Sequence, residues 1–163
     1  MPDFHILLVE DDENDIFFVE RAIRDIRGLS LYVLRDGQEA IKYLRGDPPF
    51  DQRAKFPLPN LILLDLKMPK TGGFDVLNWK NNDPNFARIP VIVTSSSSLQ
   101  IDIDLAYDLG ANAYMVKPMT LQEMRHVFSV TAEFWKCISK WPSTPPASLA
   151  RAQTRQGQDK LGV

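Results

Sequence analysis

The sequence contains a single cysteine, Cys137, so no disulfide can form within one chain. A reducing, cytoplasmic location is the simplest expectation. The 19 basic and 21 acidic residues leave a net charge of -2, which does not favour a nucleic-acid partner. No apolar run approaches the ~20 residues that a membrane-spanning helix needs. The acidic residues from Glu10 onward are not typical of a signal peptide.

What the sequence does have is a set of short apolar runs. Most of the five runs are continuous rather than alternating, which is typical of strands buried on both faces. With 44% hydrophobic and 25% charged residues, the composition indicates a folded domain with a real core. The runs are residues 6–9, 31–34, 61–64, 91–93 and 113–116.

An amphipathic pattern follows the first run. Ile16, Val19, Ile23 and Ile26 recur at helical spacing, which predicts a helix with one apolar face. Gly28 comes directly after this pattern and is the predicted stop of the helix.

Helical signals also lie between the later runs. Residues 36–39 and 120–123 have the sequence of capping boxes, which predict a second helix and a long last helix. Two more helices are expected at about residues 75–81 and 99–109, the latter ended by Gly110. Strand and helix therefore alternate five times. The predicted fold class is α/β: a doubly wound, five-stranded parallel sheet in the flavodoxin-like order 2-1-3-4-5, with an extended C-terminal helix.

Two segments interrupt this alternation. Residues 47–60 contain four prolines and are expected to form an extended surface loop before the third strand. Residues 142–163 are rich in Pro, Ser, Gln and Ala, and we expect them to be a mostly disordered tail. The predicted organisation is therefore one domain over residues 1–141, followed by this tail.

Chemically capable side chains follow four of the five predicted strands: Glu10 and Asp11, then Asp65, Thr94 and Lys117. In a doubly wound sheet these positions share one edge, where carboxylates within ~4 Å of one another would repel by a few kcal/mol. A hard divalent cation relieves that repulsion, and oxygen ligands without His or Cys favour Mg²⁺ over zinc. With Lys117 and Thr94 nearby, such a site would neutralise a phosphoryl group bound to a nucleophilic carboxylate.

Each residue also has a plainer interpretation when it is taken alone. Asp12 or Asn14 suits a helix N-cap, and acidic residues after a strand are often no more than that. Lys117 and Pro118 would also suit the end of a strand, and a lone Asp65 after an apolar run is unremarkable. The combination, at the ends of four strands in the right order, favours a phosphoryl-accepting site.

Four stretches resemble the response-regulator receiver domain of two-component signalling. They agree with that family in order and spacing and cover about residues 5 to 135. The stretches are ILLVEDDEND, LILLDLKMPKTGG, IPVIVTSSSS and GANAYMVKPMT.

The resemblance implies an acceptor and a metal site. By position, Asp65 matches the aspartate that accepts the phosphoryl group. Asp11 would bind Mg²⁺ directly, Glu10 largely through water, and Lys67 through its backbone carbonyl, with Mn²⁺ able to substitute. The first acid is Glu10 rather than the commoner Asp. Lys67 places a long cationic side chain beside the site, and Gly72 stands where the family more usually has Asp.

The resemblance also implies a switch. Thr94 matches the switch hydroxyl, Lys117 the lysine that pairs with phosphate, and Tyr114 the aromatic switch residue. Pro118 would follow a cis peptide bond, as is usual in the family. Phosphorylation would shift a pre-existing equilibrium between two forms of the surface made by the fourth helix, the fifth strand and the fifth helix.

A narrower resemblance is to the stand-alone receivers that partner bacterial phytochrome histidine kinases. It rests on the Pro-rich insertion and on the final Phe134-Trp135 and Trp141-Pro142 pairs. No output domain follows, so we expect a protein that acts by binding. It would catalyse only its own phosphotransfer and dephosphorylation, and it would not be an enzyme with external turnover.

The last predicted helix carries two apolar stripes, more than one buried face needs. It would run some 22 residues, roughly 33 Å. One stripe contains Met124, Phe128, Trp135 and Ile138. The other contains Val127, Val130, Phe134, Cys137 and Trp141. We expect the second stripe to form a homodimer interface, although the insertion or the tail could cover it instead.

Three other functions fit parts of the pattern. A receiver-like binding module that never sees phosphate is disfavoured by the intact Asp65, Thr94 and Lys117. A flavodoxin-like redox protein would carry a Ser, Thr and Gly loop after the first strand, where this chain is acidic. A hydrolase with an aspartyl nucleophile would usually have a second Asp two residues on, where this chain has Lys67.

Overall fold

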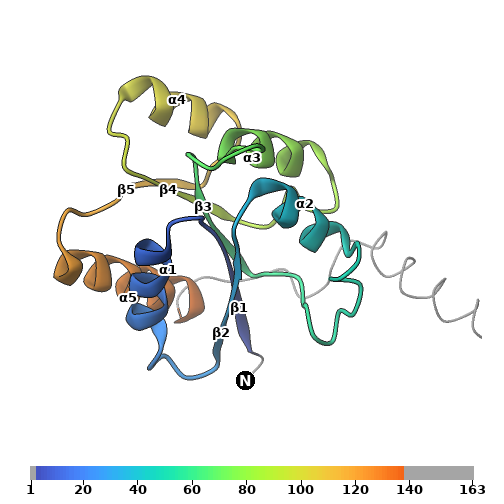
Figure 1. Ribbon diagram of the computed structural model, residues 1–163, viewed down its shortest axis with the longest axis horizontal. Helices are drawn as coiled ribbons and strands as arrows, with labels where there is room; N and C mark the ends of the chain where they lie inside the picture. The colour runs from blue at the N-terminus through green and yellow to red at the C-terminus, as the bar shows by residue number, and fades with distance from the viewer. Residues whose placement is uncertain (1–2, 138–163) are drawn as a thin grey trace, which may run out of the picture.

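A computed structural model describes residues 3–137. Its five strands form one parallel sheet in the order β2-β1-β3-β4-β5, which confirms the predicted topology (Figure 1). The strands are β1 (Phe4–Val9), β2 (Leu29–Leu34), β3 (Leu61–Asp65), β4 (Val91–Ser95) and β5 (Ala113–Val116). The helices are α1 (Glu13–Ile23), α2 (Gly37–Arg45), α3 (Gly73–Asn82), α4 (Gln100–Asp108) and α5 (Leu121–Cys137).

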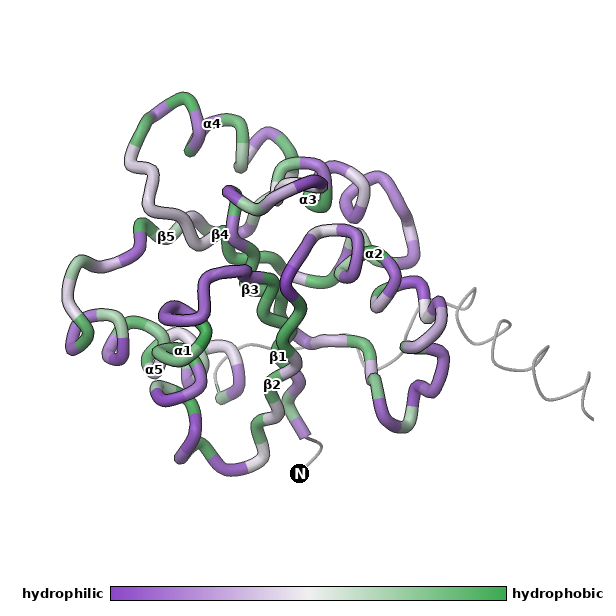
Figure 2. Tube along the Cα trace, viewed as in Figure 1, coloured by the Kyte–Doolittle hydropathy of each residue, from purple (hydrophilic) through white to green (hydrophobic). Residues whose placement is uncertain are grey.

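Helices cover both faces of the sheet, α1 and α5 on one face and α2, α3 and α4 on the other. Successive residues of a strand point to opposite faces. In β1, Ile6 and Leu8 pack toward α1 and α5, whereas Leu7 and Val9 pack toward the other three helices. Figure 2 shows the resulting green, apolar centre of the sheet. Burial on both faces explains why the strands read as continuous apolar runs.

Helix α1 begins as predicted but ends early. The Asp12 carboxylate caps its N-terminus by accepting hydrogen bonds from the N–H groups of Asn14 and Asp15. The helix ends at Ile23 rather than at Gly28, because the chain must turn back there to enter β2. Gly28, with φ +67°, belongs to that turn, and its carbonyl accepts from Phe4 N.

The other predicted helices are present. Asp36 caps α2, and Glu39 accepts from Arg35 N rather than from the cap residue itself. Gly110, with φ +99°, follows α4 as predicted, and the Ala111 N–H closes the turn onto Ala106 O. Helix α3 starts at Gly73, slightly before the expected bound.

The Pro-rich insertion has no helix or strand, but it is not simply extended. Arg53 reaches back to the end of α2 and donates to the carbonyl oxygens of Tyr43 and Leu44 at 2.8 and 2.6 Å. The Tyr43 hydroxyl donates to Pro57 O at 2.8 Å, and Phe50 and Phe56 pack around the Tyr43 ring. These contacts fold the insertion onto the α2 side of the core.

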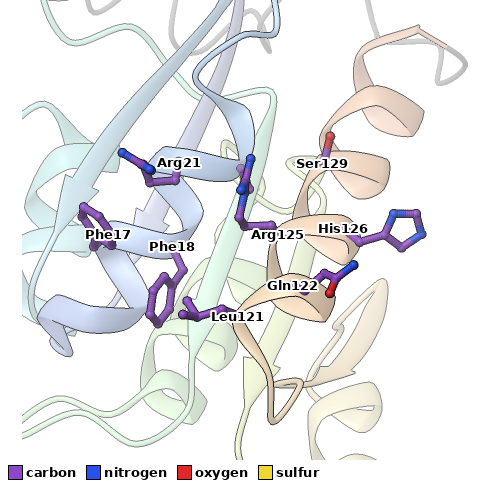
Figure 3. A pocket seen from close by; sticks show the side chains of 9 residues that line it. Phe17, Phe18, Arg21, Leu121, Gln122, Arg125, His126 and Ser129 are labelled. Carbon is purple, nitrogen blue, oxygen red and sulfur yellow. The ribbon is translucent and has the colours of Figure 1, made fainter.

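Helices α1 and α5 lie side by side, with a groove of about 680 Å³ between them. In Figure 3, Phe18 of α1 and Leu121 of α5 point toward each other in this groove. No helix within residues 3–137 is long and apolar enough to cross a membrane. Trp141, the last turns of the expected long helix and the tail at 142–163 lie outside the described residues.

Candidate functional site

The carboxyl ends of the strands bring the expected residues to one edge of the sheet. Glu10 directly follows β1, and Asp65 is the last residue of β3. Thr94 pairs with Asp65 in the register of β3 and β4, and Lys117 follows β5. Residues far apart in the sequence therefore meet because the sheet is parallel and doubly wound.

Three carboxylates converge at this edge. Oxygen atoms of Glu10, Asp11 and Asp65 lie within 4.8 Å of one another. Glu10 and Asp65 are only 2% and 4% exposed, whereas Asp11 is exposed. Burial raises the pKa of Glu10 to about 7 and also raises the pKa of Asp65. This donor set fits a hard divalent cation, because every ligand is an oxygen and a cation would offset the desolvation of the carboxylates.

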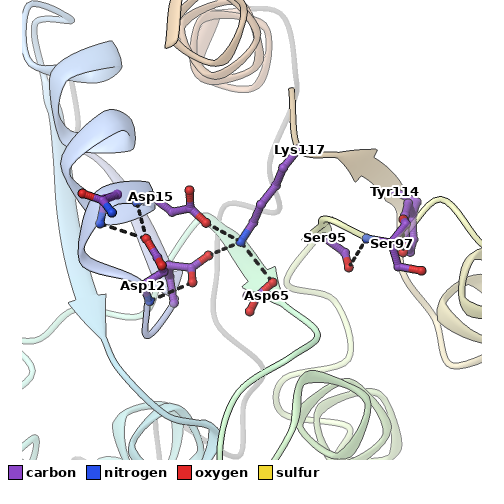
Figure 4. A network of polar contacts seen from close by, with 9 residues as sticks. Asp12, Asp15, Asp65, Ser95, Ser97, Tyr114 and Lys117 are labelled. Atoms are coloured by element: carbon purple, nitrogen blue, oxygen red, sulfur yellow. Dashed lines mark hydrogen bonds and ion pairs between the residues drawn. The ribbon is translucent and has the colours of Figure 1, made fainter. Parts of the chain in front are cut away.

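Lys117, which follows β5, brings a positive charge to these carboxylates (Figure 4). Its Nζ lies 2.7 Å from Glu10 Oε2, 2.7 Å from Asp15 Oδ2 and 3.2 Å from Asp65 Oδ1. Burial alone would lower the pKa of this ammonium, but the hydrogen bonds to Asp15 and Glu10 raise it above its ordinary value. The lysine is therefore held charged.

The contact between Asp15 and the Lys117 ammonium was not predicted from the sequence. The Asp15 side chain comes from the first turn of α1, three residues after the capping Asp12. This spacing could have indicated the contact from the sequence, because it places the Asp15 carboxylate at the N-terminal end of α1, which faces the carboxyl edge of the sheet. The Asp12 N–H donates to Glu10 Oε1 at 3.0 Å, so the loop that carries Glu10 also fixes the start of the helix.

Of the expected switch residues, Lys117 contacts the carboxylates directly, Thr94 lies beside Asp65 in the sheet, and Tyr114 contacts the loop after β4. Thr94 is buried at the end of β4. The Tyr114 hydroxyl donates to Ser97 O at 3.0 Å, which ties β5 to the loop before α4. In the same loop, Ser95 Oγ accepts from Ser97 N, and Ser95 O accepts from Lys117 N at 2.7 Å. Lys117 and Tyr114 are thus connected through the Ser95–Ser97 segment.

The loop after β3 is shaped by glycine. A Cβ on Gly73 would lie 2.2 Å from Asp65 O, so only glycine allows α3 to start this close to the strand. The Gly72 N–H donates to Asp75 Oδ2, which is one of the two hydrogen bonds of a capping box. The other bond would need a side chain at position 72, which glycine lacks. The Lys67 side chain is exposed at this rim.

One expected feature of the edge is wrong. The structure has one cis peptide bond among residues 3–137, between Pro48 and Pro49, so the bond before Pro118 is trans. An X–Pro bond has only a small intrinsic bias between its two forms, and residue type alone therefore does not decide which one occurs.

The geometry is that of a known family. The sequence pattern of the response regulator receiver domain matches residues 6–129. The chain belongs to this family. Among curated proteins, it is 34% identical over 131 residues to response regulator Rcp1 of Synechocystis, covering 80% of this chain and 87% of Rcp1. It is 32% identical over 134 residues to the probable methanogenesis regulatory protein FilR2 of Methanothrix harundinacea, covering 81% and 83%.

Solved structures agree with this membership. The structure is similar to that of the phosphorylated cyanobacterial phytochrome response regulator RcpA, with a TM-score of 0.82, 36% identity and coverage of 86% of this chain and 99% of RcpA. It is also similar to the Mn²⁺-bound form of Rcp1, with a TM-score of 0.80, 33% identity and the same coverage. Receiver domains accept a phosphoryl group on an aspartate and bind Mg²⁺ or Mn²⁺ at an acidic pocket.

Proposed function

We propose that this receiver accepts a phosphoryl group on Asp65 from a partner histidine kinase in the cytoplasm. The observation that carries this assignment is the position of the Asp65 carboxylate. It lies at the buried end of β3, close enough to the Glu10 and Asp11 carboxylates to bind one metal ion with them. Asp65 Oδ1 is also 3.2 Å from Lys117 Nζ. Asp15, the other carboxylate that contacts Lys117, is outside the group of three whose oxygens converge.

The metal would be held by Glu10, Asp11 and Asp65, with the backbone carbonyl of Lys67 completing the share of the protein. When bound, Mg²⁺ or Mn²⁺ supplies positive charge that stabilises the phosphoryl oxygens. The chain itself contributes the nucleophile, the ammonium of Lys117 and the Thr94 hydroxyl on the neighbouring strand.

In the transfer, an Asp65 carboxylate oxygen attacks the phosphorus of a phosphohistidine on the kinase. The new O–P bond forms as the P–N bond breaks, and its electron pair returns to the imidazole. Lys117 neutralises the charge that moves onto the acceptor side, and Thr94 donates a hydrogen bond to a phosphoryl oxygen. Water later hydrolyses the acyl phosphate. The protein thus catalyses only its own phosphotransfer and dephosphorylation.

Phosphorylation would be read at the surface formed by α4, β5 and α5. Thr94 moves toward the phosphoryl group and Tyr114 moves inward behind it, which breaks the hydrogen bond from Tyr114 to Ser97 O. Because Ser97 begins the approach to α4, the change at Asp65 reaches that helix through a short loop.

A phytochrome-type histidine kinase is the proposed donor. The similarity to Rcp1 and to the phytochrome response regulator RcpA supports it. The test is transfer of labelled phosphate from autophosphorylated histidine kinases of the host, with a phytochrome-type kinase among them. We expect rapid transfer from that kinase to the wild type and to Asp51→Asn, an exposed control, and no transfer to Asp65→Asn. Equal labelling of Asp65→Asn would overturn the assignment of the acceptor.

A homodimer through α5 is the second part of the proposal. Val130 and Phe134 are 50% and 47% exposed, and Cys137 is also exposed. Val130 and Phe134 line an apolar hollow of about 370 Å³ between β5 and α5, together with Ile92, Met115 and Trp135 among others. Apolar side chains beside a hollow are a common feature of contacts between two copies. Val127, which is half-buried, starts the same stripe, and Trp141 lies outside the described residues.

Light scattering at micromolar concentration, with and without beryllofluoride and Mg²⁺, tests the dimer. We expect a wild-type dimer in at least one of these conditions. Phe134→Glu should be a monomer in both, whereas the adjacent exposed Glu133→Gln should behave as wild type. A wild-type monomer in both conditions would contradict the dimer and leave the phosphoryl acceptor untouched.

A further inference from the structure

Lys117 contacts two carboxylates of the acidic site, those of Glu10 and Asp65, and a third carboxylate outside it, that of Asp15. An ammonium has three N–H donors. In this structure three carboxylates surround it, those of Glu10, Asp15 and Asp65. The two shorter contacts, 2.7 Å each, go to Glu10 and Asp15, and the longer one, 3.2 Å, goes to Asp65. The ammonium group therefore lies closer to Glu10 and Asp15 than to Asp65, the residue that would receive the phosphoryl group.

Asp15 differs from the other two carboxylates in where it is held. It lies at the rim, where its side chain is 23% exposed, whereas those of Glu10 and Asp65 are 2% and 6% exposed. Its backbone N–H donates to Asp12 Oδ1 at 3.0 Å, which fixes it in the first turn of α1. The positive end of the helix dipole also favours a carboxylate there. Asp15 is thus a fixed anion that neither the metal nor the phosphoryl group would engage.

We propose that Asp15 is a positioning residue that holds Lys117 on the α1 side of the site and competes with the phosphoryl group for it. The inference rests on the proposed function, because it assigns a control on the same acceptor. A phosphoryl group brings up to about two negative charges to Asp65. To reach those oxygens, Lys117 must loosen its hydrogen bond to Asp15. The strength of that bond therefore sets part of the barrier to phosphorylation.

The test compares initial rates of phosphorylation by acetyl phosphate, over a range of its concentrations and with saturating Mg²⁺. In Asp15→Asn, a nearly isosteric change, Lys117 loses one charged competitor. We expect the maximal rate constant to rise about fivefold, the scale of one charge-assisted hydrogen bond at a partly exposed site. The concentration of acetyl phosphate at half-maximal rate should change little, and the affinity for beryllofluoride should rise by a similar factor.

Three further comparisons separate positioning from a general effect on the helix. Asp15→Glu keeps the charge and should restore a rate near that of the wild type. Glu13 is an exposed residue of the same helical turn, and its carboxylate pairs with Arg35 rather than with Lys117. Glu13→Gln should therefore leave the rate unchanged. In a Lys117→Met background, Asp15→Asn should change beryllofluoride affinity less than about twofold, because the residue through which it acts is gone.

An unchanged or slower rate in Asp15→Asn overturns the inference, as does an effect that persists without Lys117. Urea unfolding of each variant checks that it is folded. If Asp15→Asn does not fold, Asp15→Ser replaces it, because serine is also favourable at the start of a helix. The outcomes are distinct from those for the acceptor. If the wild type is phosphorylated on Asp65 and Asp15→Asn is no faster, only the role of Asp15 fails; if Asp65 is never labelled, the proposed function itself fails.

Discussion

Within residues 3–137, the buried Lys80 and the largely buried Lys117 lie at sites with opposite electrostatics. Lys80 of α3 is 1% exposed, and its ammonium donates to one neutral partner, Ala87 O, at 3.0 Å. Lys117 is surrounded by three carboxylates. Burial lowers the pKa of Lys80 to about 8, whereas the carboxylates raise the pKa of Lys117. Burial alone therefore does not determine the pKa of a lysine, because the groups that contact the ammonium can reverse the direction of the shift.

The difference separates a structural lysine from a functional one. The Lys80 hydrogen bond pins the segment after α3 onto the helix and needs no charge. Lys117 balances carboxylates that would otherwise be buried together, and it stays charged for a phosphoryl group. Removing each lysine should therefore have opposite consequences for stability.

The largest effect is expected at Lys117. In Lys117→Met, Glu10 and Asp65 keep their burial but lose their counter-charge. We expect the free energy of unfolding to fall by about 3–5 kcal/mol without divalent metal. Mg²⁺ should recover part of that loss, because a cation binds the folded form preferentially. Urea unfolding in EDTA and in Mg²⁺ measures both. A loss below about 1 kcal/mol in EDTA would contradict the account, since that is typical of an exposed ion pair.

Lys80→Met should change the free energy of unfolding in the opposite direction. At pH 7 the folded wild type carries a buried charge, and the variant removes it at the cost of one hydrogen bond to Ala87 O. We expect the variant to be more stable by about 1–2 kcal/mol. Between pH 8 and 10.5, unfolded Lys80 binds a proton that the folded form has lost, so wild-type stability rises with pH relative to the variant. Denaturation across this range measures the difference, and a pH-independent difference would refute the buried-charge explanation.

The metal site should show its own pH dependence. Burial raises the pKa of Glu10 to about 7, so a proton competes with the metal below that value. The ionised carboxylate also destabilises the metal-free fold as the pH rises from 4.5 to 7. We expect Mg²⁺ affinity, measured by calorimetry, to increase about tenfold between pH 6 and 8. Glu10→Gln should flatten this dependence. An equally steep dependence in that variant would assign the titration to another group.

The smallest effect is expected at the acceptor itself. Because burial raises the pKa of Asp65, its ionised form destabilises the metal-free fold. Asp65→Asn should therefore raise the free energy of unfolding in EDTA by up to about 1 kcal/mol. The exposed Asp51→Asn is the matched control and should be neutral. A clear decrease for Asp65→Asn would mean that its attraction to Lys117 outweighs its burial.

The sequence predicted the strand order and the acidic edge because both follow from patterns with few alternatives. Continuous apolar runs separated by helical patterns leave little choice but a parallel sheet. Once the sheet is parallel, Glu10, Asp65, Thr94 and Lys117 must meet at its carboxyl edge. The family resemblance added their roles, and the match to residues 6–129 confirmed the family.

What the sequence did not predict depends on contacts between distant segments. Asp15 lies in the first turn of α1, and its contact with Lys117 appears only in the structure, because the two residues are far apart in the sequence. Lys80 lies in a helix whose pattern does not mark it as buried. Arg53 lies in a loop that was predicted to be extended, yet it donates to Leu44 O at the end of α2. The end of α1 was set by the turn into β2 rather than by Gly28, a tertiary constraint that local pattern does not encode.

The central claim is that Asp65 is the phosphoryl acceptor. The most direct test is incubation with acetyl phosphate and Mg²⁺, followed by borohydride trapping and peptide mass spectrometry. The account predicts one modified residue, Asp65, with no product in Asp65→Asn and none without divalent metal. Modification of another carboxylate in the wild type, or none at all in protein shown to be folded and to bind Mg²⁺, would contradict it.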